Sequence, residues 1–315
     1  MAKIKIFRPR TSTKDIRNKI KFYYTEKFFN KWMNKYDIDS LNYQQKHYIF
    51  KKLWCDGTVA CSLIGSGDDQ LAGLINDGVV DMKENKLIFT PWVFADRYNI
   101  YDFPTHIRLV NTRGVKFITN KALELDKEAV IIYAQKNHKS IFSNIEAKLL
   151  ELVDIEMKKR VARKAQTQPW MFAFSPEDYE QAKVLHEQMQ DDEPFMFVPF
   201  QDVDKAKSLT SGAPYIVDKL EQDRQKVEND ILTMLGTNNV GVGEKKEHLV
   251  VDEINANNED IEQQSMSYTN QLEDDFERAG KIFNYPMTVR DINKEFKEAE
   301  TQIDKEEEDD GSMYD

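Results

Sequence analysis

The sequence has few residues of the kinds that build metal or redox sites. It contains only two cysteines, Cys55 and Cys61, separated by five residues, and five histidines that form no close pair. Zinc sites draw on closely spaced Cys and His pairs, and the chain offers no second pair. We therefore expect no metal and no cofactor. We also expect both cysteines to be small buried apolar side chains, not a disulfide.

Long hydrophobic runs are also missing. No stretch reaches the roughly 18 consecutive apolar residues of a membrane-spanning helix, so we expect no membrane partner. Residues 1–8 are basic and lack the apolar run of a signal peptide. These two absences predict a chain that is made and kept in a cytoplasm.

Catalytic motifs are absent as well. Residues 236–241 have the first spacing of a phosphate-binding P-loop, but Val242 and Gly243 follow where Lys and Ser or Thr are needed. His186 is followed by Glu but lacks the second His of the zinc proteases. No nucleophile elbow or Cys–His signature occurs. We therefore predict that the chain has no catalytic residues and is not an enzyme.

Positive charge is in deficit over the whole chain. Asp and Glu number 55 against 44 Lys and Arg, which gives a net charge of -11. Tight binding along a DNA backbone needs clustered cations, so an acidic chain is poorly suited to bind DNA tightly. The acidic charge is still compatible with a protein that holds DNA weakly and lets it slide. The composition, 31% charged and 40% hydrophobic, is polar for a chain with long helices. It suggests that subunits bury one another.

One segment is basic. Residues 1–21 hold eight Lys and Arg and a single acid, Asp15. The first four cations are Lys3, Lys5, Arg8 and Arg10. Two interpretations stay open, a solvated tail or a contact with nucleic acid or an acidic partner.

A long helix is predicted over 213–235. Pro214 suits its first turn, Ser211 can cap it, and Gly236 ends it. A narrow apolar stripe runs along it, formed by Ile216, Leu220, Val227, Ile231 and Leu235. So thin a stripe on so long a helix is poorly suited to the centre of a core, and we expect the helix either to pack against copies of itself or to face water.

A polar loop follows this helix. Residues 236–246 contain three glycines and end in Lys245 and Lys246. The glycines place little restraint on the backbone, so we expect a mobile basic loop.

Periodicity predicts the other elements. Aromatic residues at helical spacing predict two helices within 22–54, and short β-rich runs predict a small antiparallel sheet or barrel within 86–120. A second long helix is predicted over 137–168, with Ser143 and Glu146 as its capping box.

The remaining segments alternate between small modules and helices. Residues 170–199 read as a strand–helix–strand module, and 272–283 and 289–296 read as helices. The acidic end, 298–310, is expected to be disordered.

Several segments share an unusual order of residues with one known family. They are 213–220, 234–236, 244–247, 251–253, Asn255 and 260–262. This run of about fifty residues resembles the portal proteins of small short-tailed double-stranded DNA bacteriophages, also called head–tail connectors or upper collar proteins.

The resemblance implies an α+β, mainly α, fold. The subunit would be elongated and of the portal type, with long stem helices, a small SH3-like β module in the wing and a strand–helix–strand clip. The implied order is N-terminal arm and wing, first stem helix, clip, second stem helix, channel loop, then wing or crown helices with an acidic tail. The corresponding ranges are 1–138, 139–168, 169–208, 209–236, 237–252 and 253–315.

The resemblance also implies a function. It is that of a dodecameric ring with a central channel for double-stranded DNA at one capsid vertex, used for genome packaging, retention and ejection and for joining head to tail. The implied partners are the major capsid protein, a lower collar or tail protein, a packaging ATPase and, as an optional addition, a packaging RNA. The implied location is the virion, with assembly in the host cytoplasm.

The resemblance assigns roles to individual cations. Lys219, Lys245 and Lys246 would contact DNA in the channel, and the four N-terminal cations at positions 3, 5, 8 and 10 would contact a packaging RNA or another partner. The alternatives are a solvated or salt-bridged Lys219 and a loop that only lets the chain turn. For the whole chain, the alternative is a cytoplasmic helical scaffold or adaptor without a channel.

Overall fold

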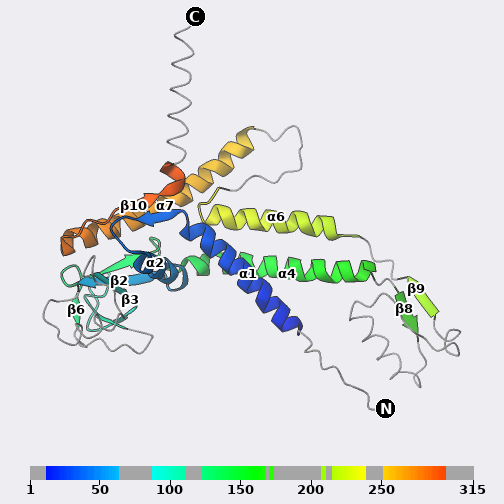
Figure 1. Ribbon diagram of the computed structural model, residues 1–315, viewed down its shortest axis with the longest axis horizontal. Helices are drawn as coiled ribbons and strands as arrows, with labels where there is room; N and C mark the ends of the chain where they lie inside the picture. The colour runs from blue at the N-terminus through cyan, green and yellow to red at the C-terminus, as the bar shows by residue number, and fades with distance from the viewer. Residues whose placement is uncertain are drawn as a thin grey trace, which may run out of the picture. The chain divides into compact units, whose positions relative to one another are not determined.

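The computed structural model describes residues 12–63, 87–110, 122–167, 170–173, 207–210, 215–238 and 251–295. The chain divides into two compact units. One comprises Met1–Ile20 and Leu150–Glu228, and the other comprises Lys21–Leu149 and Asn229–Asp315. Helices predominate and short strands accompany them (Figure 1), in agreement with the expected mainly helical α+β class.

Two aromatic helices build one part of the core. They are α1 (Thr13–Met33) and α2 (Tyr43–Cys55), and they confirm the two helices predicted from aromatic spacing. Trp32 of α1 is fully buried and meets Phe50 of α2 edge to face, with ring centroids 5.8 Å apart. Because α1 begins at Thr13, the second half of the basic segment 1–21 is helical.

The start of α2 is fixed by local chemistry. The Asn42 side chain accepts a hydrogen bond from the Gln45 amide at 2.9 Å, and the Gln45 side chain accepts one from the Asn42 amide at 3.1 Å. This reciprocal capping box satisfies two amides that the helix itself leaves without partners.

A first antiparallel sheet has β2 (Thr58–Leu63) at its centre. It pairs with β3 (Leu87–Thr90) on one side and with β7 (Ala129–Tyr133) on the other, where Ala60 lies opposite Ile131. Sequence analysis predicted β3 but neither β2 nor β7.

A second antiparallel sheet has the order β4, β5, β6, from Trp92–Phe94, His106–Leu109 and Leu123–Glu124. Ile107 of β5 is fully buried and joins one apolar cluster with Ala60 of the first sheet. The two sheets therefore share a core. The β-rich prediction for 86–120 is confirmed for β3, β4 and β5, while residues 111–120 lie outside the described part.

The two long helices predicted from periodicity are present as α4 (Ile141–Thr167) and α6 (Val217–Met234). The predicted capping box of α4 is wrong. Ser140 supplies the cap, because its Oγ accepts a hydrogen bond from the Ser143 amide at 3.1 Å. The Glu146 carboxylate instead accepts from Lys21 Nζ at 3.0 Å.

A two-stranded ladder joins β8 (Trp170–Ala173) and β9 (Lys207–Thr210). β8 confirms the first strand of the predicted strand–helix–strand module. The predicted helix and second strand of that module, within 176–199, lie outside the described residues.

The C-terminal region differs most from its prediction. Val251–Phe283 forms a single long helix, α7, of which the sequence predicted only the end. The predicted helix over 289–296 is wrong in its first half, because Val289–Asp291 is strand β10, and the described residues end in a helical turn at 292–295. β10 pairs antiparallel with β1 (Tyr36–Ile38). These long-range backbone hydrogen bonds outweigh a helical pattern that extends over only two turns.

The cysteines divide between core and surface. Cys61 on β2 is fully buried, and burial raises the pKa of its thiol well above the ordinary range. Cys55, at the end of α2, is exposed, so the prediction that both are buried is wrong for Cys55. The acidic end 298–310 lies outside the described residues.

Candidate functional site

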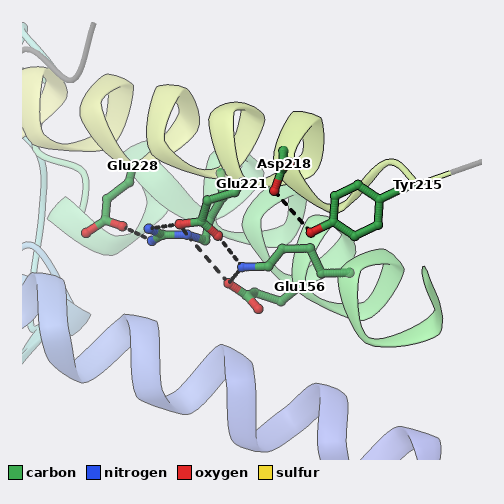
Figure 2. A network of polar contacts seen from close by, with 7 residues as sticks. Glu156, Tyr215, Asp218, Glu221 and Glu228 are labelled. Atoms are coloured by element: carbon green, nitrogen blue, oxygen red, sulfur yellow. Dashed lines mark hydrogen bonds and ion pairs between the residues drawn. The ribbon is translucent and has the colours of Figure 1, made fainter. Parts of the chain in front are cut away.

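A network of ion pairs joins α4 and α6 (Figure 2). Lys159 of α4 is only 5% exposed, and its Nζ contacts Glu221 of α6 and, at 3.3 Å, Glu156 of α4. Arg224 of α6 pairs with Glu221 at 2.6 Å and with Glu228. An ammonium so deeply buried is stable only when it is paired, so Lys159 holds the two helices at this level.

The network also defines the direction of the helices. Glu156 of α4 lies 3.8 Å from Nε of Arg224 on α6, and Lys159, one turn later on α4, pairs with Glu221, one turn earlier on α6. The helices are therefore antiparallel (Figure 1). Two cations facing several carboxylates at set distances specify one register, since a slip along either helix would separate the pairs.

Glu221 is the most strongly perturbed member of the network. Hydrogen bonds from Arg224 and then Lys159 lower the pKa of its carboxyl from 4.5 to about 2, against an opposing effect of desolvation. The carboxylate thus stays ionised over the whole ordinary pH range. The ionisation of Glu221 therefore does not change near neutral pH.

The apolar stripe predicted on α6 is largely covered within this chain. Ile231 and Leu235 have no exposed area, and Val227 and Leu220 are 5% and 9% exposed. Ile216, just before the helix, is 39% exposed. A side chain without exposed area cannot contribute area to an interface in this conformation. Of the five stripe residues, Ile216 therefore has the most apolar area available for contact with another subunit. The role of the stripe as a subunit interface stays a prediction.

The opposite face of α6 carries its exposed charges. Lys219, Asp223 and Lys226 are exposed and follow one another at helical spacing. Among the residues that the structure describes, no ion pair involves Lys219. Its side chain lies on a face different from that of the Lys159 network, as a channel cation would require.

The end of α6 is held by a buried lysine that sequence analysis missed. Lys35 is 2% exposed, and its Nζ donates to the Gly236 carbonyl at 2.8 Å and to Ser265 Oγ. It lies 3.5 Å from the carboxylate of Asp291 on β10. One ammonium thereby joins the end of α6 to α7 and β10. A lysine directly after a helix gives no sequence signal of burial.

Gly236 is required at this junction. Its φ is +61°, and a Cβ there would lie 2.6 Å from the Ser265 amide nitrogen. Both the positive φ and the close approach exclude a larger residue. Gly236 ends α6 as predicted, and residues 237–238 continue into the segment that bears Lys245 and Lys246.

A cavity of about 590 Å3 lies beside this junction. Lys35, Ser265, Thr269 and Asp291 line it together with Arg290. In the described part of the chain, no group of three or more His, Cys, Asp or Glu side chains is placed to hold a metal ion. None of the described helices has the length and apolar character that crossing a membrane requires.

Comparison with known proteins identifies the family. The sequence model described as Phage Connector (GP10) matches residues 5–295. This chain belongs to the phage connector family. The sequence-based assignment to the portal proteins, or head–tail connectors, is thereby confirmed. The connector family is structural and not enzymatic, and its members belong to the phage virion.

Two solved structures resemble this connector at low identity. The portal and tail of native bacteriophage P68 align over 90% of this chain and 91% of that one, at 14% identity and a TM-score of 0.41. The HK97 family phage portal protein from Corynebacterium diphtheriae aligns over 89% and 94% of the two chains, at 9% identity and a TM-score of 0.46.

Most of the connector's predicted contact cations fall outside the described residues. These are the channel-loop lysines and the N-terminal cations, namely Lys245, Lys246, Lys3, Lys5, Arg8 and Arg10. The structure brings together the network of Lys159 and Arg224, which sequence analysis did not single out. The signal for Lys159 was present in the cluster of cations at the end of α4, but nothing distinguished it from exposed neighbours such as Arg163.

Proposed function

We propose that this connector forms a dodecameric ring with a central channel for double-stranded DNA at one capsid vertex. The ring would act in genome packaging, retention and ejection and would join head to tail. The observation that carries the proposal is the family match over 5–295. A net charge of -11 supports it, because a mostly repelling wall lets a polyanion slide.

In this proposal α4 and α6 are the stem of the ring. The Lys159 network fixes each antiparallel pair, and the exposed stripe that contains Lys219 faces the DNA. Lys245 and Lys246 add weak contacts at the end of the stem, since lysine acts on phosphates as a flexible point charge.

The other parts follow the order along the chain. The N-terminal arm and wing take 1–138, with the two sheets from β2 to β7 as an SH3-like module, and the stem helices take 139–168 and 209–236. The clip takes 169–208, and the paired strands β8 and β9 lie near its two ends. The channel loop takes 237–252, and wing or crown helices with the tail take 253–315.

The partners belong to the same proposal. The ring would contact the major capsid protein, a lower collar or tail protein, a packaging ATPase and, optionally, a packaging RNA. The cations Lys3, Lys5, Arg8 and Arg10 would serve the last two. Assembly would take place in the host cytoplasm before the ring enters the virion.

Negative-stain imaging of the purified chain tests the proposal directly. We expect rotationally symmetric rings with a central hole and twelve subunits. Monomers or open filaments would favour a helical scaffold without a channel and would overturn the proposal. Packaging of DNA into capsids built with and without the ring then tests the channel itself.

A further inference from the structure

The connection between β4 and β5 displays large apolar side chains on a fixed backbone. Asn99 Oδ1 accepts hydrogen bonds from the amides of Tyr101 and Phe103, at 2.9 and 3.0 Å, and the Asn99 amide donates to the Phe103 carbonyl at 2.8 Å. Thr105 donates to the Arg97 carbonyl through both its amide and its hydroxyl. These bonds hold the turn closed, so little ordering entropy is left to lose on binding.

Five apolar side chains of this turn and of the adjoining end of β4 face solvent. Phe94 and Tyr98 stack with ring centroids 4.2 Å apart, and the tip residues Ile100 and Tyr101 are 87% and 73% exposed. We call Phe94, Tyr98, Ile100, Tyr101 and Phe103 the aromatic loop. Their exposed fractions together equal about three complete side chains, or roughly 600 Å2. So much exposed apolar area around one short turn is typical of an interaction surface.

We propose that the aromatic loop is an intersubunit contact that binds a second copy of this chain. The proposal rests on the ring of the proposed function. The exposed area is close to the roughly 800 Å2 that one partner contributes to a standard interface. Copies with a net charge of -11 repel one another, and the loop offers a contact where Asp96 and Asp102 are partly balanced by Arg97.

The same unit offers a complementary surface on α1. Phe22 and Tyr23, the α1 pair, are 67% and 60% exposed. Their helix, Thr13–Met33, carries six Lys and Arg against two acids. Arg17 and Lys21 pair with Asp154 and Glu146 of α4, and the remaining charges still leave a net positive charge, where the aromatic loop has a slight negative excess. Each copy therefore has one surface of each kind. A contact between two unlike surfaces is heterologous, the type that closes into rings.

The first experiment removes the tip of the loop. Ile100→Ser with Tyr101→Ser should leave the fold intact, because both side chains are exposed, and circular dichroism and thermal unfolding check this. We expect mass photometry to show at least a tenfold increase in the concentration needed for assembly. Met266→Ser, a 58% exposed apolar position on α7, is the matched control and should assemble like the parent chain. Equal loss in both variants would overturn the proposal.

The second experiment tests the pairing of unlike surfaces. Phe22→Gln with Tyr23→Gln keeps good helix formers in α1 and should also block rings. Mixed one to one with the loop variant, it should form a heterodimer that grows no further, because only one intact contact remains between them. If the mixture stays monomeric, or if either variant forms normal rings, the assigned contact is wrong.

The outcomes separate this inference from the proposed function. If the parent chain forms no rings, the proposed function fails first. If the parent and the loop variant both form rings, only the aromatic loop contact is overturned. Loop-variant rings that form normally but are not incorporated into capsids would show that the shell protein, not a second copy, occupies the loop.

Discussion

At the scale of single residues, Lys35 has the largest structural role that the sequence conceals. Its ammonium lies at a junction of α6, α7 and β10 and is almost without solvent. Ions buried in this way lose their hydration, so the pair with Asp291 adds little net stability, yet removing one partner is costly. The main effect of the junction is therefore to specify one arrangement of α6, α7 and β10, and its net contribution to stability is small.

Lys35→Met removes the cation and keeps the length of the side chain. We expect the free energy of unfolding to fall by about 3 kcal/mol, the low end for breaking a buried pair, because Asp291 keeps hydrogen bonds from Ser265 and the Asn293 amide. Urea unfolding measures the change. Lys31→Met, at an exposed position near the end of α1, the helix that precedes Lys35, is the control.

A second variant separates lost charge from lost packing. Lys35→Met with Asp291→Asn removes both charges while keeping a cap for the turn at 292–295, and it should recover part of the stability. If Lys35→Met is as stable as Lys31→Met, the junction does not depend on this ion pair.

At the scale of elements, the α4–α6 pair owes its register to charge as well as to apolar burial. The pKa of Glu221 is lowered from 4.5 in the unfolded chain to about 2 in the folded one. The unfolded state therefore binds more protons between these values, and the stabilisation is present above pH 4.5 and is lost as the pH falls toward 2. Glu221 is about a third exposed, so solvent screening keeps this contribution modest.

Glu221→Gln removes the ionisation without changing the shape. We expect a loss of about 1 kcal/mol at neutral pH and a flatter decline in stability between pH 4.5 and pH 2. Thermal unfolding across this pH range gives the comparison. Asp223→Asn, on the exposed face of α6, should follow the parent curve. Identical acid limbs for the parent and Glu221→Gln would show that the network does not couple to folding.

The helices and strands differ in how well the sequence alone predicts them. α1, α2, α4 and α6 were predictable because each repeats its aromatic or apolar spacing over several turns. The three-residue strand β10 was not predictable, because its partner β1 lies about 250 residues away in the sequence and the local residue pattern does not indicate that pairing. The narrow stripe of α6 was visible in the sequence, but the burial of Ile231 within its own chain was not.

At the scale of the whole molecule, the proposed channel depends on a small number of cations in an acidic chain. Lys219 is exposed on α6, and Lys245 and Lys246 follow in sequence beyond the buried junction at Gly236. Each phosphate that a lysine neutralises steepens the salt dependence by roughly 0.9 in log–log slope, so contacts spread thinly around a ring stay weak. Weak and equivalent contacts suit DNA that must move.

Replacing Lys219, Lys245 and Lys246 with Gln should leave ring assembly unchanged and reduce the retention of packaged DNA. The measure is the fraction of DNA protected from nuclease in filled capsids over a range of salt concentrations. The matched control replaces three other lysines, the exposed Lys127, Lys136 and Lys281, with Gln. Parent-like retention at every salt concentration would remove these lysines from the channel.

The pairing of β1 with β10 has a consequence for how the subunit is made. Tyr36 lies opposite Asp291, so one strand of this ladder leaves the ribosome about 250 residues before the other. At roughly 5–20 residues per second, the earlier strand waits on the order of 12–50 s for its partner. During this time Lys35 remains in water and the junction beside it is open. A nascent chain therefore lacks this ladder and the buried pair of Lys35 with Asp291 until residues 289–291 have been synthesised.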